Sequence, residues 1–198
     1  DVLAVLVSTK LSGTINSAVQ AKAAIQSDRI EIVDSLTTSM ALGFAVMAAS
    51  RLAAQGASLA ECKKVAEEAC QRTGVLISVE TLEFLHRGGR IGGASRLIGT
   101  ALNIKPILEL QDGRIEPLEK VRTRAKALAR MVDLLGERSD GKSFQVAVVH
   151  ANAEEEAHAL LKQVTTRYHT TLQVIAPVSP VVGTHVGPGT MGLVWMID

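Results

Sequence analysis

The chain has 198 residues, of which 47% are hydrophobic, with 21 basic and 20 acidic side chains and a formal net charge of +1. An apolar, nearly neutral chain of this length excludes intrinsic disorder and leaves either one large domain or two small ones open. Aromatic residues make up only 3%, so a stacking platform for single-stranded nucleic acid is not expected, and the near-neutral charge argues against general binding to a phosphate backbone.

The first part of the chain has the pattern of a parallel α/β domain. Val2–Val7 is a continuous apolar run, typical of a strand buried on both faces. N-cap residues, glycine stops and helical spacing predict three helices, one of them opened by a capping box at Ser58–Glu61. The order strand, helix, strand, helix, helix, strand indicates a parallel sheet. The predicted strands are 2–7, 30–33 and 75–79.

Beyond residue 80 the pattern favours an α+β domain with a mixed or antiparallel sheet. Gln111-Asp112-Gly113 separates two strand-like runs and is a strong hairpin signal. A basic helix is predicted over 123–138. The other predicted elements are short helices at 80–87 and 95–102, a helix at 153–168, and strands at 144–149, 171–178, 181–186 and 191–197. We therefore predict two domains, a partial α/β domain over 1–80 and an α+β domain over 81–198.

The two cysteines predict a reducing compartment. Cys62 and Cys70 lie eight residues apart on one predicted helix, so their Cα atoms are about 12 Å apart, beyond the ~7 Å limit for a disulfide. The longest apolar run, Met40–Ala49, is too short to cross a bilayer, and no signal peptide is recognised. These features favour a cytoplasmic protein without stable membrane insertion.

The first candidate binding site is Ser12-Gly13-Thr14, which follows the first strand and opens a helix. Open α/β sheets bind ligands at that edge, and backbone N–H groups at a helix start favour anions. A phosphate or a carboxylate would suit equally. The motif has neither the P-loop spacing nor that of a nucleophile elbow. The alternative is that Ser12 only caps the helix.

The second candidate is His185, preceded by Thr184 and followed by Val-Gly-Pro-Gly. We expect this histidine to lie on the strand 181–186 before a rigid turn, where its imidazole can donate or accept a hydrogen bond near neutral pH. A lone histidine is more often a structural residue. The other histidines lack metal-ligand spacing, so no metal site is predicted.

The third candidate is Arg90 in Arg87-Gly88-Gly89-Arg90, where arginines beside flexible glycines can clamp a phosphate. A helix stop, an interdomain hinge and an arginine–carboxylate pair are the alternatives. No Ser/His/Asp set, carboxylate pair or metal triad emerges, so no catalytic residue and no cofactor is predicted.

A basic cluster surrounds the start of the predicted helix 123–138. We expect its cations to face water while Ala125, Leu128, Ala129 and Val132 pack inward. Such runs are usually solvated faces, although this one could dock an acidic partner. The basic cluster consists of Lys120, Arg122, Arg124, Lys126 and Arg130.

Several motifs taken together resemble the DegV family in order and spacing. Gly-Gly-Arg-Ile and Asn-Ile-Lys-Pro-Ile are specific in combination, and the match runs along essentially the whole chain. The matching segments are Leu11-Ser12-Gly13-Thr14, Asn16-Ser17-Ala18, Val33-Asp34-Ser35, Thr81-Leu82-Glu83-Phe84-Leu85, Gly88-Gly89-Arg90-Ile91, Leu102-Asn103-Ile104-Lys105-Pro106-Ile107-Leu108 and His185-Val186-Gly187-Pro188-Gly189.

The resemblance implies a two-domain fold that buries a long-chain fatty acid in a hydrophobic tunnel and holds its carboxylate at the domain interface. It implies that Ser12 and the Gly13 amide bind the carboxylate, that His185 approaches it from the second domain, and that Arg90 belongs to the interdomain Gly-Gly-Arg motif. Thr14 and Thr184 are possible further head-group contacts. The family's N-terminal Thr-Ser-Gln-Pro motif, whose threonine also binds the carboxylate, has no counterpart here.

Two functions follow as hypotheses. The first is non-catalytic binding of a long-chain fatty acid, which for some family members includes presenting the acid to a separate fatty acid kinase. An aliphatic, aromatic-poor chain suits an alkyl ligand, whose burial contributes ~0.8 kcal/mol per CH₂. The second is an enzyme or carrier subunit that binds a small phosphorylated ligand through the Ser-Gly-Thr loop and Arg90.

Overall fold

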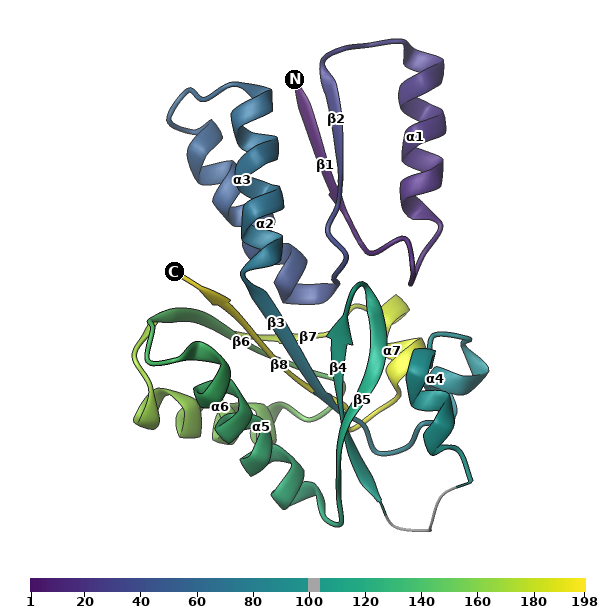
Figure 1. Ribbon diagram of the computed structural model, residues 1–198, viewed down its shortest axis with the longest axis vertical. Coiled ribbons are helices and arrows are strands. Elements are labelled where there is room, and N and C mark those ends of the chain that lie inside the picture. The colour runs from purple at the N-terminus through teal and green to yellow at the C-terminus, as the bar shows by residue number, and fades with distance from the viewer. Residues whose placement is uncertain (100–103) are drawn as a thin grey trace. The chain divides into compact units, whose positions relative to one another are not determined.

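The computed structural model describes residues 1–99 and 104–198, and the chain divides into two compact units. Unit 1 holds a two-stranded sheet, and unit 2 holds a six-stranded sheet (Figure 1). The predicted fold class is confirmed, because the first sheet is parallel and the second is mixed. Unit 1 comprises Asp1–Thr73 and Asp112–Arg114, and unit 2 comprises Gly74–Gln111 and Ile115–Asp198.

Unit 1 contains two parallel strands and three helices. The strands pair in register from Val2↔Ile30 to Leu6↔Asp34. Figure 1 shows α2 and α3 on one side of the strands and α1 on the other. A small core of Val33, Ala49, Cys62 and Ala66 lies between the sheet and the α2–α3 pair. The elements are β1 (Val2–Leu6), α1 (Thr14–Ile25), β2 (Ile30–Asp34), α2 (Ser39–Ala53) and α3 (Leu59–Gln71).

In unit 1 the predicted capping box and free cysteines are present, and the predicted burial of the first strand is wrong. The Ser58 hydroxyl accepts a hydrogen bond from the Glu61 amide, and the Glu61 carboxylate accepts one from the Ser58 amide, which completes the capping box. Cys62 and Cys70 are both free thiols, as expected. β1 is not buried on both faces: Val2 is exposed and the other residues of the strand are half-buried.

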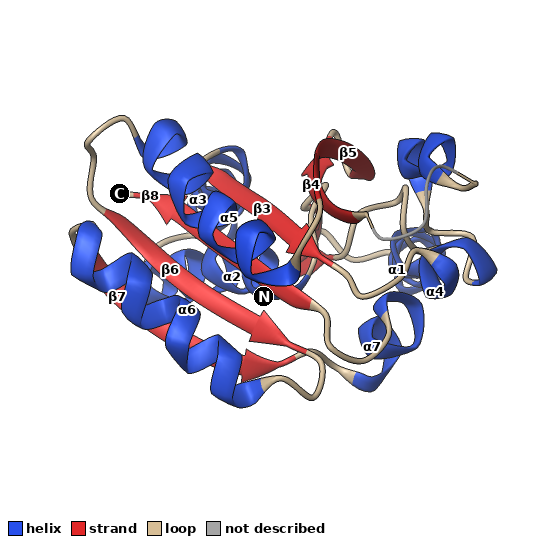
Figure 2. Cartoon of the chain, turned by 90° about the horizontal axis from the view of Figure 1, so that it is seen from below, coloured by secondary structure: helices blue, strands red, loops and turns tan. Residues whose placement is uncertain are grey.

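Unit 2 is built on a sheet of order β5-β4-β3-β8-β6-β7. Figure 2 shows α5 and α6 on one face of this sheet, where they cover a core that includes Leu76, Met131, Phe144 and Trp195. Two short helices, α4 and α7, pack against each other. The elements are β3 (Thr73–Ser78), α4 (Glu83–Arg87), the 3₁₀ helix η1 (Gly92–Leu97), β4 (Lys105–Gln111), β5 (Arg114–Val121), α5 (Arg124–Ser139), β6 (Phe144–His150), α6 (Glu154–Arg167), β7 (Thr170–Pro177), α7 (Pro180–Val186) and β8 (Met191–Ile197).

β3 belongs to the second sheet, although its predicted place was at the end of the first domain. It pairs antiparallel with β4 from Leu76↔Glu109 to Ser78↔Ile107 and lies next to β8 on its other side. The side chains of Val75–Ser78 are accordingly buried. The division between the units falls between Thr73 and Gly74, after the first residue of this strand, whereas the predicted boundary was near residue 80.

The predicted hairpin is present, with Asp112 and Gly113 at φ values of 48° and 79°. Both positive angles match a two-residue turn whose twist suits the flanking strands. The turn belongs to unit 1, while β4 and β5 belong to unit 2. The predicted helix at 95–102 is replaced by η1, and its residues 100–102 lie outside the described residues.

The prediction of a strand over 181–186 is wrong, because the structure has the helix α7 there. Ser179 caps this helix by accepting a hydrogen bond from the Val182 amide at 3.4 Å, and Pro180 occupies a first-turn position, where its missing N–H costs nothing. The cap and the proline outweigh the β-branched valines that suggested a strand. His185 therefore lies in the last turn of a helix.

Among the residues that the structure describes, no helix is long and apolar enough to cross a membrane.

Candidate functional site

The carboxyl ends of β1 and β2 meet at one edge of the unit 1 sheet, because the two strands are parallel. The loops that leave this edge are linked by backbone hydrogen bonds. The Ser8 amide donates to the Thr37 carbonyl at 2.9 Å, and the Ser35 amide donates to the Leu6 carbonyl at 3.1 Å. The edge is therefore one connected structure formed by residues 8–14 and 34–39.

Asp34 holds the two loops together. Its carboxylate accepts hydrogen bonds from the Thr9 hydroxyl at 2.7 Å, from the Thr9 amide at 3.3 Å and from the Leu36 amide at 3.0 Å. Leu36 and Ser39 have left-handed φ values of 48° and 54°, which non-glycine residues adopt only where their surroundings enforce them. The position of Asp34 at a strand end was the available sequence signal, but its role in holding these loops was not predicted.

Ser12 is half-buried at the start of α1, as predicted. Its amide donates to the Ser8 carbonyl at 3.0 Å, and its hydroxyl accepts from the Thr14 amide at 3.3 Å and shares a 2.7 Å hydrogen bond with the Thr14 hydroxyl. Gly13 is the exposed N-cap residue, without a side-chain cap. The Ser12 hydroxyl thus bonds within the loop, and the loop presents hydroxyl and amide groups beside a helix N-terminus, which are neutral donors suited to an anion.

His185 and Arg90 come together within unit 2, around Gly88. A Cβ atom at Gly88 would collide with Nδ1 of His185, and one at Gly187 would collide with the ring of Phe84, so both glycines permit the close packing of α4 against α7. Arg90 donates from Nη1 to the Gly88 carbonyl at 2.8 Å. Nδ1 of His185 is buried without a hydrogen-bond partner among the described residues.

Thr184 is turned toward the backbone of its own helix. Its hydroxyl donates to the Pro180 carbonyl at 2.9 Å, one helical turn earlier. An intrahelical hydrogen bond of this kind already uses the donor of the hydroxyl. A role for Thr184 as a head-group contact stays a prediction.

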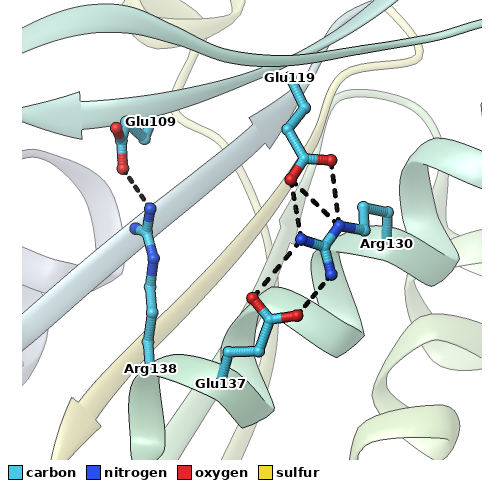
Figure 3. Close-up of polar contacts among 5 residues, drawn as sticks. All are labelled: Glu109, Glu119, Arg130, Glu137 and Arg138. Atoms are coloured by element: carbon cyan, nitrogen blue, oxygen red, sulfur yellow. Dashed lines mark hydrogen bonds and ion pairs between the residues drawn. The ribbon is translucent and has the colours of Figure 1, made fainter.

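The prediction that the whole basic cluster faces water is wrong for two of its members. Arg124 forms ion pairs with Glu80 at 2.5 Å and Glu156 at 2.6 Å, and only 20% of its side chain is exposed. Arg130 is paired with Glu119 and Glu137 (Figure 3). Their partners lie on other elements or a full turn or more away along α5, which a search for local charge patterns does not detect.

The inward face of α5 also differs from the prediction. Leu128 and Val132 are buried as expected, but Ala125 and Ala129 are exposed, and Ala127 and Met131 are buried instead. The helix is rotated relative to the predicted orientation, so that the charged ends of Arg124 and Arg130 reach carboxylates on neighbouring elements.

An apolar pocket of about 240 Å³ lies in unit 1 between β1 and the α2–α3 pair. The side chains of Leu3 and Val5 from β1 line it, and helices α2 and α3 supply most of the remaining wall. The lining from α2 is Val46, Ala49, Ser50 and Ala53. Within residues 1–99 and 104–198, no group of three or more His, Cys, Asp or Glu side chains could hold a metal ion.

The sequence matches a known family along its whole length. The model of the family described as "Uncharacterised protein, DegV family" matches residues 1–198. The DegV domain-containing protein SCO2569 of Streptomyces coelicolor is 41% identical over 188 residues, a match that covers 94% of this chain and 66% of that protein. The chain thus spans just under two thirds of the length of this relative.

Two solved structures show the same fold. One, described as fatty acid binding of a DegV family protein from Thermus thermophilus, has a TM-score of 0.93 at 32% identity and covers 99% of this chain and 70% of that chain. The other, described as DegV, a fatty acid binding protein from Bacillus subtilis, has a TM-score of 0.87 at 34% identity and covers 100% of this chain and 71% of that chain.

Proposed function

This chain belongs to the DegV family, and from that membership we propose that it binds a long-chain fatty acid without catalysing a reaction on it. The observation that carries the proposal is the composition of β1 and the loop after it. The strand contributes Leu3 and Val5 to an apolar pocket, and the loop that follows presents the hydroxyl and amide groups of residues 12–14. An apolar wall and neutral donors on one continuous segment suit an amphipathic acid.

In this proposal the carboxylate binds to Ser12 and Gly13 in unit 1. The hydroxyl of Ser12 exchanges its bond to Thr14 for one to the acid, and the N-terminal amides of α1 add the favourable field of a helix start. Hydroxyl and amide donors satisfy a carboxylate without a fixed cation.

His185 in unit 2 is the residue for which the family resemblance implies a head-group role, and we propose that role for it. Its Nδ1 has no partner among the described residues, and Gly88 leaves the imidazole the space that it occupies. Arg90 donates a hydrogen bond to the carbonyl of the same glycine. We propose that Arg90 fixes the segment that packs against His185, and we assign it no direct contact with the tail.

A further part of the proposal concerns where the bound acid goes. We propose that the protein acts in the cytoplasm, consistent with its two free thiols, and that it presents the acid to a separate fatty acid kinase. A carboxylate held at a loop at the edge of a unit is closer to a second protein than one enclosed in the core, which supports presentation over storage.

The test is a titration of Ser12→Ala with a fluorescent fatty acid. We expect binding weaker by about 1–2 kcal/mol, since the variant loses a hydrogen bond to a charged group. Ser17→Ala is the matched control, because Ser17 is exposed on the same helix and outside the loop. An unchanged dissociation constant for Ser12→Ala would show that the carboxylate binds elsewhere.

His185→Ala and the double variant complete a double-mutant cycle. If both residues contact one carboxylate, their effects on affinity should be coupled and not additive. Mass spectrometry of organic extracts identifies the ligand independently. A co-purifying fatty acid supports the proposal, and a phosphorylated metabolite would replace it with a site for a small phosphorylated ligand at the Ser-Gly-Thr loop and Arg90.

A further inference from the structure

Thr37 is a buried residue whose hydroxyl has no partner among the described residues. Only 4% of the residue is exposed, and Oγ1 is fully buried. Its other polar groups are satisfied, because the Thr37 amide donates to the Ser35 hydroxyl at 3.2 Å and the Thr37 carbonyl accepts from the Ser8 amide at 2.9 Å. A buried hydroxyl without a hydrogen bond loses the free energy of its hydration without replacement. The position therefore indicates a missing partner.

The place of Thr37 in the fold identifies what kind of partner is missing. Ser8 donates its amide to the Thr37 carbonyl and accepts the Ser12 amide at its own carbonyl, so Thr37 and Ser12 are each one hydrogen bond from the same residue. Both lie where a helix begins at the carboxyl edge of the sheet, α1 after Ser12 and α2 after Thr37. Two helix N-termini at one edge favour a bound anion.

Asp34 is the negative charge already at this edge, and it does not use Thr37. Its two carboxylate oxygens accept from the amide and hydroxyl of Thr9 and from the amide of Leu36. The donors that neutralise Asp34 are thus distinct from the hydroxyls of Ser12 and Thr37. The hydroxyls of Ser12 and Thr37 make no hydrogen bond to Asp34, so they can donate to a second carboxylate at this edge.

We infer that the Thr37 hydroxyl is a further donor to the ligand carboxylate, beside Ser12. The inference rests on the proposed function, since it names a second residue of the same head-group site. It also accounts for a buried polar atom that would otherwise only reduce stability. A hydroxyl that is unpaired in the empty protein and paired in the complex contributes to affinity at the expense of the free state.

The experiment compares Thr37→Val with the wild type, using palmitate and its methyl ester as ligands. Valine keeps the branched shape of threonine and removes the hydroxyl. We expect affinity for palmitate to fall about ten- to hundredfold, the scale of one hydrogen bond to a charged group, while affinity for the ester, a neutral and weaker acceptor, falls much less. Thr37→Ser should restore binding of the acid, and Thr38→Val is the control, because Thr38 is adjacent and makes no side-chain cap bond.

Thermal unfolding of the ligand-free proteins separates a binding role from a structural one. Thr37→Val should unfold at the same or a higher temperature than the wild type, because an unpaired buried hydroxyl has been removed. A lower unfolding temperature, or equal losses for acid and ester, would mean that Thr37 is structural and would overturn the inference. Undiminished palmitate binding would overturn it too. If the wild type binds no palmitate, the proposed function itself fails.

Discussion

The α5 face of unit 2 and the sheet edge of unit 1 both collect polar side chains, but they satisfy them in different ways. On α5, Arg130 donates through Nε and Nη2 to Glu119 and through Nη1 to Glu137, and Arg138 donates to Glu109 (Figure 3). Each cation is fixed by carboxylates of the same unit. At the unit 1 edge the groups are small hydroxyls and amides, and Thr37 keeps a buried hydroxyl without a partner among the described residues.

The difference shows which kind of polar group remains available for a ligand. A guanidinium already held by two carboxylates must lose them before it can bind an acid, and that exchange is costly in a partly buried setting. A hydroxyl can change partners by rotating about a single bond. Arg130 and Arg138 are therefore better placed to stabilise unit 2 than to bind an acid, while the edge of unit 1 is the better candidate for binding a carboxylate.

Reversing the charge of Arg124 should give the largest effect. Arg124→Glu would place a third carboxylate between Glu80 and Glu156, with the side chain only 20% exposed. We expect a loss of about 2–4 kcal/mol in the free energy of unfolding, as for removal of one partner from a partly buried charge network. Urea unfolding measures it.

The control for this prediction is Arg122→Glu, since Arg122 is exposed two residues earlier. Its stability should stay within about 0.5 kcal/mol of the wild type. If Arg124→Glu is as stable as this control, the pairing on α5 is incidental, and the comparison between the two regions no longer holds.

A smaller effect is expected at Arg130, and it should depend on pH. Hydrogen bonds from Arg130 lower the pKa of Glu119. A carboxyl whose pKa is lower in the folded state contributes stability above its unfolded pKa of around 4, and this contribution disappears as the pH falls through the folded pKa. Arg130→Met keeps the aliphatic packing and should lose about 1 kcal/mol at neutral pH.

The pH profile is the decisive measurement for Arg130. Because the variant lacks the pair, its stability should decline less steeply below pH ~4 than that of the wild type. If the stability of the two proteins declines equally steeply with falling pH in the acid range, the Arg130–Glu119 pair contributes no net stability. Glu137→Gln, which leaves the Glu119 pair intact, should retain the wild-type slope.

Sequence patterns predicted the features whose partners are close in the chain. The Ser58–Glu61 capping box, the Asp112-Gly113 turn and the extent of α5 each depend on residues within a few positions of one another. The same locality explains the resemblance between this chain and its family, because short motifs such as Gly-Gly-Arg-Ile are contiguous. These features follow from backbone propensity and side-chain capping alone.

Features that depend on distant partners were missed or mistaken. Arg124 pairs with Glu80, which follows β3 and lies 44 positions earlier in the chain, and nothing in the local charge pattern indicates this partner. The sheet to which β3 belongs was decided by its pairing with β4 and β8. The Thr37 hydroxyl is buried without a hydrogen-bond partner among the described residues, which only the three-dimensional structure reveals.

The smallest expected effect concerns the three exposed members of the basic cluster. Lys120, Arg122 and Lys126 are exposed, and no ion pair is formed by them within the described part of the chain. Reversing all three to glutamate should leave both the stability and the fatty acid dissociation constant nearly unchanged, because exposed cations add little to either. If an acidic kinase subunit docks on these residues, its rate of association with the triple variant should be lower.

We therefore expect the triple variant to slow phosphorylation of the bound acid by about three- to tenfold at low ionic strength, since complementary charge acts chiefly on the rate of association. In about 1 M salt, where the screening length is ~3 Å, variant and wild type should react at the same rate. The salt dependence separates docking from damage to the site, because a distorted head-group loop would stay slow in salt. If variant and wild type are phosphorylated at the same rate at low ionic strength, these three residues form only a solvated surface and do not dock a kinase.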